Sequence, residues 1–195
     1  SIRLDALGTK HSVPSCAWQI TKAASQGVFD RNRATLAGLD EGERRLLATG
    51  TDVEKENGTI LKASSFRGPE RKAHSFVISG DTAEQSIHPI GIPTVLVHEA
   101  TFLEDSHSKA EEHLHSTAMG AARTAKACGA EHLVLTHFSA RIRDASESLT
   151  EAKEEYEDAG ITYANDGDRF QIDVDGNVTF YRRNVHGWKQ HNITH

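Results

Sequence analysis

Three short apolar runs, each ending on polar residues, dominate the hydrophobic pattern of the chain. They occupy residues 76–79, 94–97 and 132–135. Nearly continuous aliphatic or β-branched runs of about four residues are typical of strands buried on both faces of a sheet. Residues 17–20 alternate between apolar and polar positions, which predicts a further strand. We expect no regular element in residues 1–10.

Helical periodicity separates the second run from the third. Small residues recur there at steps of three and four: Ala118, Ala121, Ala122, Ala125 and Cys128. This spacing predicts a helix over 118–128, capped by Ser116 or Thr117 and ended by Gly129. A second helix is expected over 149–159, and further strands over 161–164, 170–174 and 178–181. Alternating strands and helices predict an α/β fold, and the absence of a repeat or linker favours one domain.

Residues 21–74 form a polar segment with few apolar anchors and many charged residues. Leu46 and Leu47 follow a plausible helical turn, and the pair Asn57-Gly58 is a hairpin signal ahead of Ile60. Unstructured loops of this length are uncommon inside compact domains. We therefore interpret residues 21–74 as an insertion or protruding arm.

Composition narrows the class of protein. The 195 residues include 22 Lys and Arg and 28 Asp and Glu, a net charge of −6, which argues against nucleic-acid binding through bulk charge alone. No apolar run approaches the roughly 20 residues of a membrane helix, and the first residues lack the apolar core of a secretory signal. Cys16 and Cys128 form no CxxC pair, which favours free thiols in a reducing, intracellular compartment.

Polar residues placed directly after the apolar runs are the candidates for chemistry. Asp81, His98, Glu99 and His137 follow or end predicted strands, and His11 precedes one. The chain has 12 His, and imidazole with carboxylate suits zinc or manganese. Taken singly, each of these residues is as well explained by a turn or a hydrogen-bonded side chain, so spacing alone does not decide for a metal site.

Five short motifs, read together, carry a resemblance to a known family. They are His11-Ser-Val-Pro-Ser15, Ser79-Gly-Asp-Thr82, His98-Glu-Ala-Thr-Phe102, His115-Ser-Thr-Ala118 and Leu135-Thr-His-Phe-Ser-Ala-Arg141. In this order they resemble the C-terminal half of ribonuclease Z, the tRNA 3′-processing endonuclease of the metallo-β-lactamase superfamily. Asn165-Asp-Gly167 resembles the family's closing strand and turn. The resemblance implies half of an αββα sandwich, residues 1–195, with residues 21–74 as the inserted arm.

The resemblance also implies roles for individual residues. Asp81 would bridge two zinc ions, or manganese ions in their place, with His11 on one and His137 on the other. His115 would donate a proton to the leaving oxygen, and Glu99 would orient His115. The residues implied to contact phosphate are Ser116, Thr117 and Arg141. His98 is left between a metal-site role and ordinary packing at the strand end.

The sequence departs from the family pattern in its metal-binding motif. The signature HxHxDH, which supplies most remaining zinc ligands, does not occur, and His113-Leu-His115 is the one HxH. Three ligands shared by two zinc ions leave each ion short of the usual four. We therefore expect these residues to be one half of a longer protein, and the fragment alone to neither hold two zinc ions nor cleave RNA.

The arm departs from the family pattern as well. The family's Gly-Pro-rich core is missing, and acidic residues around 40–43 would weaken attraction to phosphate. The residues expected to contact tRNA are Arg31, Arg33, Arg44 and Arg45, with a solvated charged surface as the alternative. This departure affects the tRNA substrate more than the hydrolytic chemistry.

The function expected from the resemblance is a zinc-dependent endoribonuclease that acts on precursor tRNA. A homodimer, a cytoplasmic location and no membrane association go with it. One alternative is a metallo-β-lactamase-fold hydrolase of a small phosphodiester or ester. The other is a half without catalysis that binds substrate or a partner, which the retained His11, Asp81 and His137 disfavour. P-loop, dinucleotide-binding and Ser-His-Asp enzymes are disfavoured because their Gly-rich or GxSxG motifs are absent.

Overall fold

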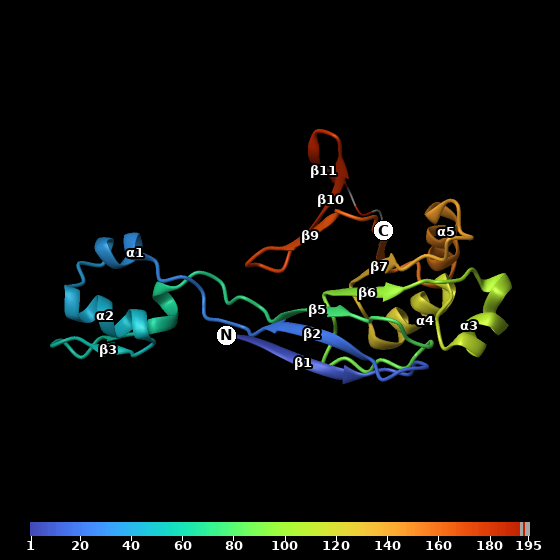
Figure 1. The fold of residues 1–195 in the computed structure, drawn as a ribbon. Coiled ribbons are helices and arrows are strands. Elements are labelled where there is room, and N and C mark those ends of the chain that lie inside the picture. The colour runs from blue at the N-terminus through green and yellow to red at the C-terminus, as the bar shows by residue number, and fades with distance from the viewer. Residues whose placement is uncertain (192, 194–195) are drawn as a thin grey trace. The chain divides into compact units, whose positions relative to one another are not determined.

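Figure 1 shows the computed structural model of the chain, which describes residues 1–191 and 193. The chain divides into two compact units, one made of Ser1–Ala23 with Ala73–His195 and the other of Ala24–Lys72. Among the described residues, no helix combines the length and apolar character required to cross a bilayer.

A six-stranded mixed sheet forms the larger unit, in the order β1-β2-β5-β6-β7-β8. The first two neighbouring pairs are antiparallel and the last three are parallel. The strands are β1 (Ile2–Gly8), β2 (Cys16–Lys22), β5 (His74–Ile78), β6 (Val95–Glu99), β7 (His132–Thr136) and β8 (Gly160–Tyr163). Strands β5, β6 and β7 lie at the three apolar runs of the sequence. A strand covered on both faces requires apolar side chains at nearly every position.

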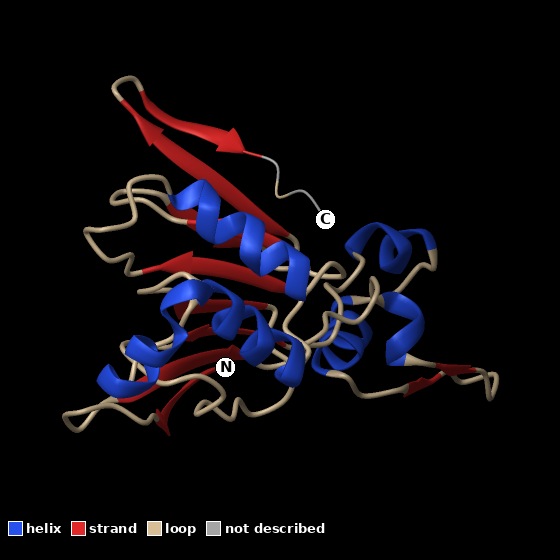
Figure 2. Cartoon of the chain, turned by 90° about the vertical axis from the view of Figure 1, so that its right-hand side faces the viewer, coloured by secondary structure: helices blue, strands red, loops and turns tan. Residues whose placement is uncertain are grey.

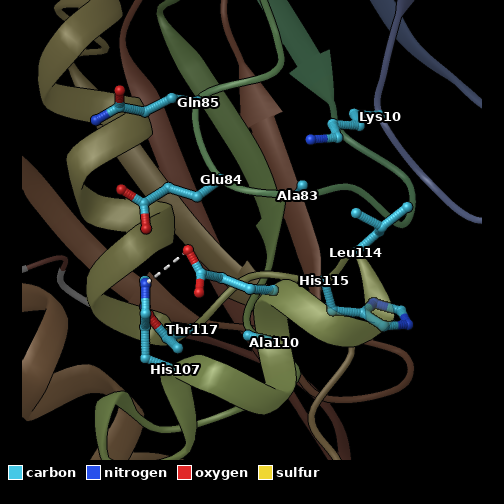
Figure 3. A pocket seen from close by; sticks show the side chains of 10 residues that line it. Lys10, Ala83, Glu84, Gln85, His107, Ala110, Leu114, His115 and Thr117 are labelled. Atoms are coloured by element: carbon cyan, nitrogen blue, oxygen red, sulfur yellow. Dashed lines mark ion pairs between the residues drawn. The ribbon is translucent and has the colours of Figure 1, made fainter.

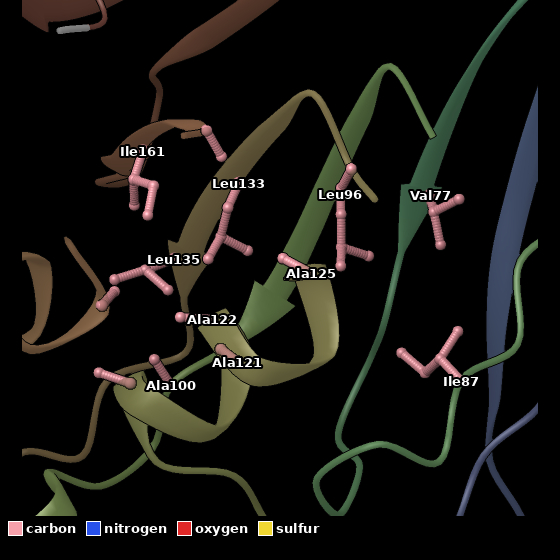
Figure 4. Packing of buried hydrophobic residues seen from close by; sticks show 14 of the residues in the cluster. Val77, Ile87, Leu96, Ala100, Ala121, Ala122, Ala125, Leu133, Leu135 and Ile161 are labelled. Carbon is pink, nitrogen blue, oxygen red and sulfur yellow. The ribbon is translucent and has the colours of Figure 1, made fainter. Parts of the chain in front are cut away.

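Two helices cover one face of this sheet, as Figures 2 and 4 show. Helix α4 (Ala118–Cys128) presents four fully buried alanines to the sheet, and α5 (Ala145–Glu155) presents Ala152. The strands contribute larger side chains to the same core, among them Val77, Leu96, Leu133, Leu135 and Ile161. Small residues on the helix and large ones on the sheet let α4 lie close to the strands, with packing that leaves little free volume.

Large apolar side chains are exposed on the neighbouring strands β2 and β5 of the sheet. Trp18 is 45% exposed, and Ile20 and Ile78 are each 41% exposed. The strand register places Trp18 opposite Ile78, so these side chains share one face, away from Ala17 and Val77. An exposed apolar surface of this kind in a soluble protein usually marks an interaction site.

A second sheet, in the order β11-β10-β9, follows at the C-terminal end. Its strands are β9 (Arg169–Ile172), β10 (Val178–Asn184) and β11 (Gly187–His191). The turn between β9 and β10 forms where expected, because the Asp173 carboxylate accepts hydrogen bonds from the backbone N–H groups of Asp175 and Asn177. Phe180 of β10 is fully buried.

The structure corrects several expectations for individual elements. Residues 2–8 form β1, although no regular element was expected there, because β1 pairs along its whole length with β2. Helix α5 starts four residues earlier than expected and ends at Glu155, and Gly160 begins β8 instead of ending the helix. Asp144 sets the start of α5 by accepting a hydrogen bond from Ser146 N. Strand β11 and helix α3 (His107–His113) were not predicted.

The smaller unit, Ala24–Lys72, is folded around its own apolar cluster. It contains α1 (Arg31–Leu36), α2 (Glu41–Thr49), the hairpin β3 (Val53–Glu54) with β4 (Ile60–Leu61), the 3-10 helix η1 (Ala63–Phe66), and a core of Ala34, Leu39, Leu47, Val53, Ala63 and Phe66. The Asn-Gly hairpin therefore forms as expected. Asp40 and Glu43 form a reciprocal capping box that starts α2.

Candidate active site

Five side chains from different segments meet at the carboxyl ends of the parallel strands. Asp81 follows β5, Glu99 ends β6 and His137 follows β7. His11 comes from the loop between β1 and β2, and His115 from the turn between α3 and α4. The carboxyl ends of parallel strands meet at one edge of a sheet, and loops at that edge commonly carry functional groups on a rigid support.

The geometry brings three imidazoles around one carboxylate. His11, Asp81 and His115 each offer a ligand atom, and these atoms lie within 4.8 Å of one another. His137 Nε2 lies 3.4 Å from Asp81 Oδ1. The ring of His115 is 4.8 Å from that of His11 and 5.6 Å from that of His137, centroid to centroid. Groups more than a hundred residues apart along the chain therefore form one cluster.

Each imidazole uses Nδ1 for a contact within the protein. His11 Nδ1 lies 3.0 Å from Leu114 O, His115 Nδ1 lies 2.6 Å from Glu99 Oε1, and His137 Nδ1 lies 2.9 Å from Thr101 Oγ1. A hydrogen bond at Nδ1 fixes the tautomer and leaves Nε2 as the nitrogen that binds a ligand, the usual arrangement behind metal-binding histidines.

Glu99 is the centre of the hydrogen bonds beneath this cluster. Its carboxylate is 1% exposed and accepts from Thr82 N, His115 Nδ1, Thr101 N, Thr101 Oγ1 and Ser116 N. With five donors at 2.5–3.2 Å, both oxygens are occupied by protein groups. Glu99 is therefore suited to orient His115 and to stabilise its N–H, and it is not free to ligate a cation.

Thr101 is a site residue that the sequence analysis did not single out. Its hydroxyl donates to Glu99 Oε2 at 2.5 Å, and the hydroxyl oxygen, Thr101 Oγ1, can then accept a hydrogen bond from His137 Nδ1. Thr101 thus joins the Glu99–His115 pair to His137. Its position two residues after Glu99 was the one available signal.

Left-handed backbone occurs at two residues of the site. His137 has φ of 57°, and Leu114, whose carbonyl accepts from His11, has φ of 55°. Non-glycine residues rarely adopt this conformation, and where they do the strain is concentrated at functional sites.

His98 lies inside the protein, away from the cluster. It is fully buried, and its Nδ1 lies 2.8 Å from Glu99 O. Burial lowers the pKa of His98 below its ordinary value, so this imidazole is neutral. The structure favours the packing role at the end of β6 and gives His98 no place among the possible ligands.

A pH dependence of stability follows from His98. Because its pKa is lowered in the folded state, the unfolded chain binds more protons below pH 6.5, and the free energy of unfolding falls as the pH decreases through that region. One such group contributes a slope of at most about 1.4 kcal/mol per pH unit. The free energy of unfolding can be measured by urea denaturation at pH 7.5 and at pH 5.5. We expect its difference between the two pH values to be smaller for His98→Asn than for the wild type. An equal pH difference in both would contradict the assignment.

Ser116 and Thr117 have internal partners, which disfavours the expected contact with phosphate. Ser116 Oγ donates to Thr82 O at 2.9 Å, and its backbone N–H donates to Glu99. Thr117 Oγ1 donates to Glu104 at 2.6 Å and accepts from Gly120 N as the cap of α4. Both residues are 1% exposed. Arg141, by contrast, is exposed and lines a cavity of about 170 Å³ beside Thr101.

The four arginines expected to contact tRNA divide into two kinds. Arg33 donates to Ser65 O, and Arg44 donates to Leu39 O at 2.8 Å, so both stabilise the smaller unit itself. Arg31 and Arg45 are exposed, and within the described part of the chain no hydrogen bond or ion pair engages their guanidinium groups. Arg31 and Arg45 are thus the better candidates of the four.

Comparison with known proteins places the chain in a wider context. No protein-family model matches it. It is 35% identical over 150 residues to ribonuclease Z of Halalkalibacterium halodurans, an alignment that covers 75% of this chain and 48% of the relative. It is 33% identical over 178 residues to ribonuclease Z of Haloferax volcanii, an alignment that covers 88% of this chain and 56% of that relative. The chain is a homologue of ribonuclease Z.

The similarity to ribonuclease Z is partial in length, since the chain spans about half of the relatives it matches. The fold agrees with this relationship. The metallo-β-lactamase fold protein YhfI from Bacillus subtilis superposes with a TM-score of 0.50 at 17% identity, over 91% of this chain and 48% of YhfI. The expected fold class, half of a metallo-β-lactamase-type sandwich, is confirmed.

The donor set of the cluster fits the metal ions expected from this fold. Imidazole nitrogens with a carboxylate are ligands of zinc and, with less preference, of manganese. His11 and His115 each place a nitrogen within 4.8 Å of a carboxylate oxygen of Asp81, and His137 Nε2 lies 3.4 Å from Asp81 Oδ1. The carboxylate of Asp81, in a side chain that is 41% exposed, contrasts with the buried carboxylate of Glu99, which accepts five hydrogen bonds from protein donors.

Proposed function

We propose that the intact protein containing these residues is a metal-dependent endoribonuclease that processes the 3′ ends of precursor tRNA. The observation that carries the proposal is the meeting of His11, Asp81, His115 and His137 above the buried Glu99 carboxylate. Homology to ribonuclease Z supports the tRNA substrate, and the retained metal-binding side chains disfavour a half that only binds.

We propose zinc as the metal, held in part by His11, Asp81 and His137. Bound divalent metal lowers the pKa of a water molecule and polarises a phosphoryl oxygen. His115 supplies the other half of the chemistry. Its ring is held through Nδ1 by Glu99, so Nε2 is presented to the substrate and can exchange a proton with the leaving oxygen.

The remaining ligands are proposed to come from a second half of the domain. The exposed apolar side chains Trp18, Ile20 and Ile78 would be covered by a second sheet in an αββα sandwich. Such a second half would also account for the exposure of the His137 and Asp81 side chains, 49% and 41%. A homodimer in the cytoplasm completes the proposal, to be tested by light scattering and by cell fractionation.

Kinetics with two substrates test the proposed function. The intact protein, loaded with zinc, is expected to cleave precursor tRNA at its 3′ side with a higher kcat/KM than it shows for bis(p-nitrophenyl) phosphate. Metal analysis of the same preparation identifies the ion. Cleavage of the small phosphodiester without cleavage of precursor tRNA would favour the alternative, a hydrolase of small substrates. One observation supports that alternative. The smaller unit has nine Lys and Arg and eight Asp and Glu, so its net charge is close to zero and attracts RNA phosphate only weakly.

Deleting the arm separates RNA binding from hydrolysis. Phe29 and Arg67 pair in an antiparallel bridge, and Asp30 N donates to Phe66 O at 2.8 Å, so two glycines can replace residues 30–66. We expect this change to weaken binding of precursor tRNA and to leave cleavage of bis(p-nitrophenyl) phosphate unchanged. The loss of Arg31 and Arg45 also reduces the salt dependence of RNA binding. Unchanged RNA affinity, measured by filter binding, would contradict the arm assignment.

A further inference from the structure

An arginine on α4 binds two carboxylates that lie near the candidate site in the sequence. Arg123 Nε and Nη2 donate to the two oxygens of Glu84 at 2.6 and 2.8 Å. Arg123 Nη2 also lies 3.1 Å from Glu104 Oε1. Glu84 comes three residues after Asp81, and Glu104 begins the 3-10 helix η2 (Glu104–Ser106) ahead of α3. One guanidinium therefore connects the Asp81 loop, η2 and α4.

The first turn of α4 has a gap that accommodates this carboxylate. A Cβ atom at Gly120 would lie 2.7 Å from Glu84 Oε2 and 3.1 Å from Thr117 Oγ1, closer than van der Waals contact permits. Figure 3 shows Glu84 beside α4, on the wall of a cavity of about 330 Å³ that His115 and Thr117 also line. Gly120 thus lets the Asp81 loop approach the helix that follows His115.

The loop and the helix are connected at several points besides Glu84. Gln85 N donates to Thr124 Oγ1 of α4 at 3.0 Å. Nearer the site, Ser116 Oγ donates to Thr82 O at 2.9 Å. The Arg123 pair lies at the outer end of this series, where the residues are partly exposed at 24% for Arg123 and 23% for Glu84.

The position of α4 itself does not depend on Arg123. Ala118, Ala121, Ala122 and Ala125 are fully buried against the sheet, and Thr117 and Gly129 cap the two ends. Loss of the guanidinium therefore removes one of the connections of the Asp81 loop to α4, while the helix itself stays in place. Hydrogen bonding to Glu84 raises the pKa of Arg123 further, so the guanidinium is charged at any relevant pH.

We propose that Arg123 and Glu84 are positioning residues, which hold Asp81 at a fixed distance from His115 by binding the Asp81 loop to α4. The proposal rests on the proposed function for its kinetic consequence. It assigns to the Arg123–Glu84 pair and to the gap at Gly120 a role that is exerted through the position of Asp81. A displacement of about 1 Å between catalytic groups can lower the rate by up to about 100-fold.

The test compares Arg123→Met, Glu84→Gln and Gly120→Ala in the intact, zinc-loaded protein with bis(p-nitrophenyl) phosphate. We expect each variant to lower kcat by about tenfold with KM within about twofold, and the Arg123→Met/Glu84→Gln double variant to lose no more than either single one. A chelator competition is expected to show weaker zinc retention in all three, because Asp81 is less well placed.

Gly120→Ala separates positioning from simple stabilisation. Alanine raises helix propensity, so a role confined to helix stability predicts an equal or higher Tm and unchanged kcat. Displacement of Glu84 predicts the loss of kcat at an equal or higher Tm. The control is Lys126→Met, which removes an ion pair between the same helix and Glu155 on the side of α5, and should retain wild-type kcat and zinc retention.

Wild-type kcat and zinc retention in Arg123→Met and Gly120→Ala would overturn this inference while leaving the proposed function intact. An intact wild-type protein that retains zinc but cleaves neither substrate would overturn the proposed function. In that case the chelator competition still tests positioning of Asp81, since it requires no turnover.

Discussion

Replacing His115 with alanine is expected to lower kcat of the intact protein by about 10²- to 10⁴-fold, with little change in KM for precursor tRNA. The reason is the contact of its Nδ1 with the buried Glu99 carboxylate at 2.6 Å, which leaves Nε2 as the group that exchanges a proton with the substrate. The effect should be smaller for a substrate with a good leaving group such as p-nitrophenolate, because that leaving group needs less help from an acid. Steady-state kinetics with both substrates measure the difference.

His113→Ala is the matched control for this experiment. His113 ends α3 two residues earlier and stacks on Phe102 at 6.5 Å between centroids. We expect its kcat to remain within a few fold of the wild type. Equal losses for His113→Ala and His115→Ala, or equal losses of His115→Ala on both substrates, would count against a proton-transfer role of His115.

Asp81→Asn is expected to remove bound metal and to lower kcat/KM by more than about 100-fold, since even indirect supports of metal ligands contribute that much. The carboxylate of Asp81 lies 3.4 Å from His137 Nε2 and within 4.8 Å of donor atoms of His11 and His115, so it is shared by the whole cluster. An amide keeps the shape and removes the negative charge that offsets the cation. Metal analysis of the dialysed protein provides the readout.

Asp158→Asn, in the exposed turn ahead of β8, serves as the control and should keep the wild-type metal content. Retention of the full metal content by Asp81→Asn would remove Asp81 from the ligand set. Loss of metal with unchanged far-UV circular dichroism would show that the effect is local and not a failure to fold.

The elements predicted best are those whose signals are local. Helix α4 has the predicted bounds, Ala118–Cys128, because its alanine spacing, threonine cap and terminal glycine all lie within fourteen residues of sequence. The parallel strands were located to within two residues by their apolar runs. Strand β1 was missed although Ile2, Leu4 and Ala6 alternate with polar residues, and pairing with β2 along its whole length holds it in the sheet. Helix α5 was misplaced because its start depends on the Asp144 cap and its end on Tyr156, whose hydroxyl contacts Ala130 O.

The sequence named the residues of the candidate site, but it did not indicate which hydrogen-bond partners those residues have in the folded protein. The five motifs pointed to Asp81, His115 and His137 through their resemblance to ribonuclease Z. The motifs did not indicate that Ser116 and Thr117 are used inside the protein. That outcome depends on the approach of Thr82 and Glu104, which are 34 and 13 residues away along the chain.

By itself, the sequence determined the α/β class and the core strands, since both depend on side chains close together in the chain. Its five motifs, through their resemblance to ribonuclease Z, also indicated the residues that we propose carry the chemistry. Only the tertiary structure decided which imidazole nitrogen faces Asp81, that five donors fill the Glu99 carboxylate, and that Arg123 binds the Asp81 loop to α4. The physical reason is that hydrogen bonds and metal ligation are effective only within about 3 Å and in specific directions, whereas His115 is 16 positions from Glu99 in sequence and Arg123 is 39 positions from Glu84.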